Sequence, residues 1–341
     1  MRTTVDPGPT SSATPPIPQP VTYSPLVRAA TIPALFGIGT LVSIQSKINS
    51  ELAVQLGTGL RAAALSAVIS FGTGLVLLTV LVLVHPATRR GLTRIYRGIG
   101  RGEVPFWLVL GGLAGALFVA SQGLSVGILG VALFIVAFVA GQSTAGLVVD
   151  HQGLGPGGRR PVSRGRMIGA GLAVVAVALS AIGSSVSTVA GLGLLVAVLP
   201  LVAGMGTSVQ QALNGRVALL AGSWATTFNN FVVGFTGLAI YFGISLLVPG
   251  TLRGLPPTWW LYLGGSLGIV FIWASSILVR VHGVLILGLG AIAGQVVSAI
   301  VIDLISAPEE LTLLSYLAAA VTLVGVAIAT LLKPRRAAVR A

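Results

Sequence analysis

The sequence predicts an all-α integral membrane protein with ten transmembrane helices arranged as two inverted five-helix repeats. Three observations lead to this prediction: an apolar composition, ten apolar segments of membrane-spanning length, and an internal repeat. Of 341 residues, 55% are hydrophobic and 8% are charged, whereas soluble domains carry about 25% charged residues. A water-soluble fold could not cover so much apolar surface, and the 46 glycines suit helices that pack closely in lipid.

The apolar segments each approach the roughly 20 residues that a helix needs to cross the hydrocarbon core. Because backbone groups in lipid must be satisfied within the segment, and because the runs are too long for barrel strands, each segment is expected to be a helix. In chain order the segments are 30–49, 62–84, 105–122, 126–148, 167–183, 190–211, 225–248, 258–279, 283–303 and 312–332.

Both chain ends are expected on the cytoplasmic side of the cytoplasmic (inner) membrane. Residues 1–28 hold seven prolines among serines and threonines and are expected to form a disordered tail, while residues 333–341 form a basic tail. With the N-terminus inside, 17 of the 20 lysines and arginines fall on the cytoplasmic side, leaving Lys47, Arg61 and Arg253 outside. This asymmetry is the usual determinant of orientation.

The internal repeat aligns Trp107–Asp150 with Trp260–Asp303 without a gap, with 15 identities in 44 positions. The repeats are expected to span residues 29–183 and 184–332. Because five is an odd number, the second repeat must enter the membrane in the opposite orientation to the first. Such inverted repeats are typical of secondary transporters, in which one half-bundle rocks against the other around a central cavity.

An earlier pair of polar residues matches at a different offset: Gln45 and Asn49 correspond to Gln210 and Asn214. Residues four apart share one helix face, and a buried amide in lipid needs a hydrogen-bonding partner. A solute could be that partner. Amides of neighbouring helices could equally be the partners, in which case these residues hold the bundle together.

Two glutamines lie at equivalent repeat positions inside predicted helices, and each follows a glycine. Asn230 has no counterpart of its kind in the first repeat, where Ser70 stands opposite. The expected substrate-binding residues are therefore Gln45, Asn49, Gln142, Gln210, Asn214, Asn230 and Gln295.

Asp150 and Asp303 end predicted helices, where a negative charge opposes the helix dipole. They either have a functional role or, as structural groups, pair with a nearby cation or cap the following segment. We find no aspartate, glutamate or histidine near the centre of any predicted span, so a proton relay at that depth is not expected.

Several function classes are excluded or disfavoured by composition. The chain has no cysteine, which removes disulfides, thiolate nucleophiles and cysteine-ligated metals. The basic residues lie between apolar runs, so we expect contact with lipid headgroups and no nucleic-acid binding. The three histidines form no metal-binding cluster and no phosphate-binding loop is present, so neither a metal nor a cofactor is expected.

The paired helix endings resemble those of a known family. The resemblance rests on three features: the segments Gln45 to Asn49 and Gln210 to Asn214, the glycines near residues 111–115 with their repeat copies, and the helix-ending aspartates. With these features the chain resembles the YdcZ-type family of the drug/metabolite transporter (DMT) superfamily, in a fused two-repeat form. The resemblance covers about residues 30–332. It implies a DMT-like ten-helix fold with a solute site between the repeats, and it names no substrate.

The expected function is a secondary transporter or exporter of a small organic metabolite or drug-like solute, acting by alternating access. The protein is not expected to be an enzyme. The alternative is a membrane scaffold or assembly protein, which requires that the amides be satisfied by other helices with no water-sized space between them. An intramembrane enzyme acting on lipids ranks last, because it needs a cluster of catalytic groups. Membrane lipids are the expected partners, and a homodimer is left open.

Overall fold

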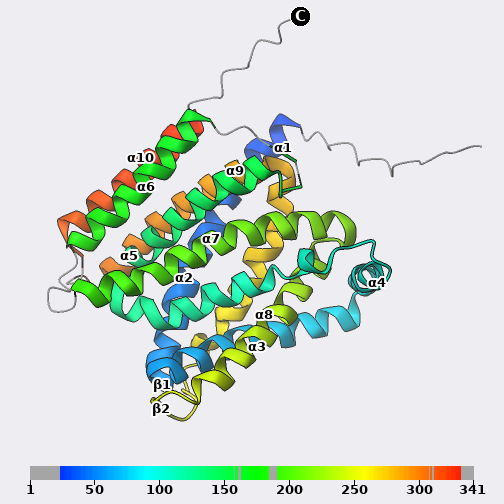
Figure 1. The fold of residues 1–341 in the computed structure, drawn as a ribbon, viewed down its shortest axis with the longest axis horizontal. Coiled ribbons are helices and arrows are strands. Elements are labelled where there is room, and N and C mark those ends of the chain that lie inside the picture. Colours follow the sequence, from blue (N-terminus) through cyan, green and yellow to red (C-terminus); the bar gives the residue numbers. More distant parts are fainter. Residues whose placement is uncertain are drawn as a thin grey trace, which may run out of the picture.

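A computed structural model describes residues 24–331, apart from 157, 160–162, 184–189, 307 and 309–310. Within these residues the chain is almost entirely helical (Figure 1). The α-helices are α1 (Pro25–Ala30), α2 (Ile32–Leu56), α3 (Gly59–Val84), α4 (Pro86–Gly100), α5 (Gly112–Gln152), α6 (Arg164–Gly183), α7 (Ala190–Ala221), α8 (Ser223–Ser245), α9 (Gly264–Ser306) and α10 (Leu313–Leu331). Short 3₁₀ turns, η1 (Phe106–Val109) and η2 (Trp259–Leu263), precede α5 and α9, and strands β1 (Gly57–Thr58) and β2 (Thr251–Leu252) pair antiparallel.

Six stretches of the described residues are long and apolar enough to cross a membrane, which makes this a multi-pass membrane protein. They are Gly59–Val84, Phe106–Gln152, Val196–Ala221, Ser223–Ser245, Trp259–Val279 and Leu287–Ser306. Shorter apolar helices lie at Met167–Ala176 and Leu313–Ala329. Helix α2 is 25 residues long but carries Gln45, Lys47, Asn49 and Glu51, which lower its mean hydropathy.

Helix α5 contains two predicted segments in one 41-residue element. At 1.5 Å per residue it is about 60 Å long, roughly twice the thickness of the hydrocarbon core. Gly130 breaks the helical geometry with φ 73° and ψ 165°, values that a residue with a side chain rarely adopts. The break therefore falls at Gly130, a few residues after the predicted gap at 123–125.

Two elements differ from the sequence-based expectation. Residues 25–28, assigned to the disordered tail, belong to α1, whose first turn is capped by the Ser24 hydroxyl accepting from the Val27 amide. The arginine-rich connection between the second and third predicted segments forms α4. Proline can start a helix at its first position, and Leu92 and Ile95 bury one face of α4 against α7 and α8, which stabilises the helix by packing. The tail at 333–341 lies outside the described residues.

The helices pack in pairs that join distant parts of the chain. Helix α2 lies along α9, α5 along α7, α3 along α8, and α6 along α10 at one edge of the bundle (Figure 1). Glycine permits two of these close approaches. A Cβ on Gly39 would overlap the Ala291 carbonyl oxygen, and a Cβ on Gly204 would overlap the Phe138 carbonyl oxygen. Small residues allow such backbone contacts between helices in lipid.

The bundle has two recognisable ends, joined by α3 (Figure 1). At the β end, β1 pairs with β2, and Arg61 donates hydrogen bonds to the carbonyl oxygens of Leu246, Val248 and Gly250. At the arginine-rich end, Arg94 donates to the Leu220 carbonyl, and Arg216 donates to the carbonyl of Gly153, which follows α5. Loops that the sequence places on one side of the membrane thus meet at one end.

Candidate functional site

A central cavity of about 30 Å³ lies between α2, α3, α5, α7, α8 and α9. It is lined by five phenylalanines and two glutamines, among other residues, and it exceeds the 10–15 Å³ that a single water requires. Twelve of its fourteen lining residues form pairs at equivalent positions of the two halves of the sequence: Val42 and Thr207, Gln45 and Gln210, Phe71 and Phe231, Gly115 and Gly268, Phe118 and Phe271, Val119 and Ile272.

The two glutamines are buried and each donates one hydrogen bond beside the cavity. Gln45 Nε2 donates to the Gly264 carbonyl oxygen at 2.8 Å, and Gln210 Nε2 donates to Asn230 Oδ1 at 2.9 Å. Both lie beside a glycine of the neighbouring helix, Gly268 for Gln45 and Gly115 for Gln210. The missing side chains on these glycines leave room for the amides to face the cavity.

Between the central cavity and the β end lies a cluster of hydrogen-bonded polar side chains. Gln122 Nε2 donates to Ser46 Oγ at 2.9 Å, and Asn49 Nδ2 donates to Gln122 Oε1 at 2.6 Å. All three side chains are fully buried. We call this group the amide cluster; none of its members lines the central cavity or the two other cavities described below.

Towards the arginine-rich end, the residues at the equivalent positions line a small cavity. Gln211, Asn214 and Ser275 correspond to Ser46, Asn49 and Gln122, and all three line a small cavity of about 10 Å³ next to the central one. Gln211 Nε2 and Ser275 Oγ are buried without a hydrogen-bond partner. Gln210, Phe271 and Ile272 line both cavities, so the two spaces are adjacent.

Asn230 differs from its counterpart Ser70 and joins α7 to α8. Its side-chain Nδ2 donates to Asn214 Oδ1, and its side-chain Oδ1 accepts from Gln210 Nε2. Asn230 is buried but does not line the cavities described here. It thereby positions two amides that do line them.

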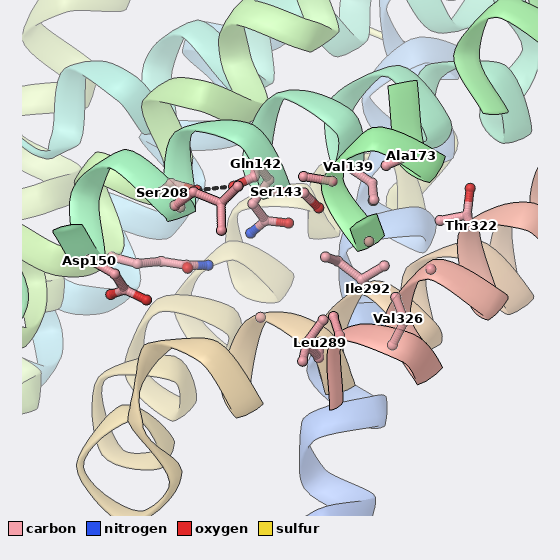
Figure 2. A pocket seen from close by; sticks show the side chains of 18 residues that line it. Val139, Gln142, Ser143, Asp150, Ala173, Ser208, Leu289, Ile292, Thr322 and Val326 are labelled. Carbon is pink, nitrogen blue, oxygen red and sulfur yellow. Dashed lines mark hydrogen bonds between the residues drawn. The ribbon is translucent and has the colours of Figure 1, made fainter. Parts of the chain in front are cut away.

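Gln142 and Gln295 are both buried with no partner for either side-chain amide atom. Their backbone carbonyls accept equivalent hydrogen bonds, from Ser208 to Gln142 and from Ser43 to Gln295. Gln142 lines a third and larger cavity of about 60 Å³ (Figure 2), which shares Gln211 with the small one. Gln295 lines none of the three.

Asp303 is a helix cap. Its two carboxylate oxygens accept from the amides of Val131 and Ala132, at 3.2 and 2.6 Å, where α5 resumes after Gly130. A carboxylate at a helix N-terminus is favourable because it satisfies free amides and complements the dipole. Asp303 therefore caps a segment 171 residues away, whereas the sequence suggested the following segment.

The structure thus brings Gln45 and Gln210 together in one cavity, and it places Asn214 at the small cavity and Gln142 at the largest of the three. Asn49, Asn230 and Gln295 lie outside these three spaces. Sequence reasoning missed Gln122 and Gln211, and it missed the aromatic rings. Gln122 had a detectable signal, since it is an amide inside an apolar run opposite Ser275 in the repeat.

No group of three or more histidine, aspartate or glutamate side chains close enough to hold a metal ion occurs among the described residues. The polar and aromatic groups around the central cavity are amides, one hydroxyl and phenylalanine rings. Such groups recognise solutes by hydrogen bonding and stacking.

The fold and its cavities define a multi-pass helical membrane protein with a polar site enclosed between its helices. The chain belongs to the family described as "Putative inner membrane exporter, YdcZ", whose model matches it over residues 30–179 and again over 195–328. This finding confirms the resemblance noted from the sequence and makes the chain a member of an inner-membrane exporter family.

One solved structure, titled only "Crystal structure of protein", shares the fold, with a TM-score of 0.53 and 15% identity. The match covers 91% of this chain and 98% of the other. No curated protein sequence matches the chain.

Proposed function

We propose that the protein is a secondary transporter that carries a small organic solute through the central cavity between its two halves. The observation that carries the proposal is the lining of this cavity, because six pairs of equivalent residues from the two halves of the sequence contribute to it. Inverted-repeat transporters place their solute site at this interface.

The proposal includes ten transmembrane helices in two inverted repeats, with both termini in the cytoplasm. Reciprocal contacts support the repeat: Gly112 lies against the Asn230 carbonyl and Gly265 against the Ser70 carbonyl, as expected for two halves related by a pseudo-twofold axis. The family model matches each half separately. With α5 and α9 each counted as two spans, the helices other than α1 and α4 make ten crossings.

The mechanism that we propose is alternating access, with the structure in a state closed at the β end. In this proposal the bonded amide cluster of Ser46, Asn49 and Gln122 closes the β end, while the residues at the equivalent positions of the other end line a cavity. The arginine excess at the latter end makes it the cytoplasmic one under the usual orientation rule. The state is therefore inward-facing.

The cavity suits a neutral or zwitterionic solute with an apolar or aromatic body. Its lining holds two amides, one threonine and five phenylalanines and no charged side chain. Phenylalanine faces stack with planar groups, and amides donate and accept hydrogen bonds. The scaffold alternative requires filled space around these amides, whereas a water-sized cavity lies between Gln45 and Gln210.

The proposal is tested with purified protein in liposomes and a panel of labelled metabolites, with and without a pH gradient. Gln45→Ala/Gln210→Ala should abolish flux of any solute that the native protein carries. Gln152→Ala makes the same change at an exposed position outside the cavities and should leave flux intact. Equal flux in the native protein and the double variant would contradict the assignment of the central cavity.

A further inference from the structure

The 60 Å³ cavity beside α6 and α10 is separate from the central one, and we call it the lateral chamber. It lies among α5, α6, α7, α9 and α10 and shares no lining residue with the central cavity. Figure 2 shows Asp150 at one end of it, Thr322 at the other, and Gln142 and Ser143 between them. The chamber is thus a second space of its own within the bundle.

Three side-chain amide atoms at the lateral chamber are buried and have no hydrogen-bond partner within the part of the chain that the structure describes. They are Oε1 and Nε2 of Gln142, which is 3% exposed, and Nε2 of Gln211, which is 8% exposed. A buried amide without a hydrogen bond costs free energy. A molecule in the chamber that pairs with these atoms removes that cost.

The pairing of α5 with α7 brings the two glutamines to the same stretch of the chamber wall. Ser208 Oγ donates to the backbone carbonyl oxygen of Gln142 at 2.6 Å, which holds the two helices together at this level. Gln211 follows Ser208 by three residues and therefore lies on the same face of α7. The chamber thus offers one acceptor and two donors from neighbouring turns of α5 and α7.

The groups that are free to pair in the lateral chamber are uncharged. None of its eighteen lining residues is a lysine, arginine or histidine. Asp150 is the one ionisable residue of the lining, and it already has an interaction of its own, so it is not one of the free groups. A carboxylate ligand would lose its water shell here with no opposite charge to replace it. The lining therefore suits a neutral polar group.

The other half of the sequence does not repeat this lining. Gln295 is the equivalent of Gln142 and lines none of the three cavities, and Ser46 is the equivalent of Gln211 and belongs to the bonded amide cluster. A packing gap inherent in the repeat would occur in both halves. The combination of a cavity with two glutamines is instead particular to one half.

We propose that the lateral chamber binds a small aliphatic primary carboxamide. The N–H group of the ligand donates to Gln142 Oε1, and its carbonyl oxygen, which has two lone pairs, accepts from Nε2 of Gln142 and of Gln211. The alkyl chain packs against Leu289 and Ile292 of the lining. A mostly apolar pocket with a few convergent polar groups is the usual form of a small-molecule site. The proposal goes beyond the transport function, since such a site can exist in a protein that moves nothing.

The test uses the full chain, which contains no cysteine, with Ser143→Cys as a reporter inside the chamber. The rate of its reaction with methyl methanethiosulfonate is measured in detergent at pH 7 with three probes of equal size: butyramide, 2-pentanone and butyrate. Butyramide should slow the reaction about threefold or more and saturably, because it alone pairs with both the donor and the acceptor of Gln142. Equal protection by 2-pentanone or butyrate would overturn the proposal. No protection by butyramide would mean that the chamber holds water alone, and would overturn it too.

Variants made with the reporter locate the binding groups. Gln142→Met keeps the length of the side chain and removes its donor and acceptor, so it should abolish protection by butyramide. It should not lower the melting temperature, since the native amide has no partner to lose. Gln211→Met should raise the butyramide concentration for half-maximal protection about threefold or more, because one hydrogen bond is lost.

Gln152→Met is the matched control, because it makes the same change at an exposed position of α5 and should leave protection intact. Full protection by butyramide in folded Gln142→Met would count against the site. If Gln142→Met fails to fold, Gln211→Met decides, and an unchanged half-maximal concentration in that variant would contradict the proposal.

A second reporter separates this site from the transport proposal. Thr207→Cys lies in the central cavity, and its reaction rate should not respond to butyramide. If only Thr207→Cys responds, the carboxamide site belongs to the central cavity and the present proposal fails while transport stands. Protection of Ser143→Cys should also persist in Gln45→Ala/Gln210→Ala, which removes the amides of the central cavity alone.

Discussion

The rings of Phe71 and Phe231 pack against each other with their centroids 4.8 Å apart and their planes tilted by 33°. Each ring also fills the space beside a glycine in the other's helix: Phe231 lies against Gly74, and Phe71 lies against Gly234. The contact joins α3 to α8 at the wall of the central cavity. A change at either glycine should therefore act on both the packing and the site.

Gly74→Ala and Gly234→Ala should each lower the free energy of unfolding by about 1–3 kcal/mol, because the added methyl overlaps a ring that cannot retreat without leaving its partner. Thermal unfolding in detergent measures the loss. Gly243→Ala on α8 is the control, since a Cβ there meets nothing within 4 Å. In Gly74→Ala/Phe231→Leu the smaller side chain should recover part of the loss, and strict additivity of the two changes would contradict the contact.

Asp303→Asn should destabilise the protein by about 1–3 kcal/mol. The asparagine side chain has one uncharged acceptor oxygen, so one of the backbone amides of Val131 and Ala132 loses its hydrogen bond. Asp303→Ala should cost at least as much. Glu51→Gln is the matched control, since it breaks the partly exposed ion pair with Lys47 at 3.8 Å, a kind of pair worth less than about 1 kcal/mol. Equal melting temperatures for Asp303→Asn and the native protein would rule out the cap.

The proposed orientation is open to a direct labelling test, because the chain lacks cysteine. Thr93→Cys lies on the exposed face of α4 at the arginine-rich end, and Gly254→Cys lies after β2 at the other end. A membrane-impermeant maleimide added to intact cells should label position 254 and leave position 93 unlabelled until the membrane is opened. The reverse pattern would place both termini outside.

If the proposed mechanism holds, Gln122→Ala should open the β end, because Gln122 bonds both Ser46 and Asn49. With Val42→Cys as a reporter in the central cavity, an impermeant thiol reagent added from the β end should react at least several times faster in this variant. Gln152→Ala serves as the comparison. An unchanged rate would show that the amide cluster does not control access.

Much of the architecture follows from residue patterns. Apolar length predicts the spans. The match of Gln45 and Asn49 with Gln210 and Asn214, at a different offset from the longer repeat, is why Gln45 and Gln210 could be chosen as a pair, and both line the central cavity. Helix α4 was missed because its apolar face, with Leu92 and Ile95, is too short to appear as a span.

The state of each amide could not be predicted, since it depends on packing between distant helices. Asn49 and Asn214 are equivalent in sequence, yet Asn49 donates to Gln122 and lines none of the three cavities, whereas Asn214 accepts from Asn230 and lines the small cavity. Likewise, Asp303 reaches α5 only because α5 bends at Gly130. A sequence pattern places these residues on a helix face and leaves open what they touch.

The most direct test of the central claim uses two single-cysteine proteins, Val42→Cys and Thr207→Cys, whose side chains face the same cavity from helices that run in opposite directions across the membrane in the proposed topology. Both are labelled with an impermeant thiol reagent in right-side-out and inside-out vesicles. The account predicts that both react, and that both react faster from the cytoplasmic side. If each reacts from a different side, or neither reacts from any side, the residues do not share a solute pathway.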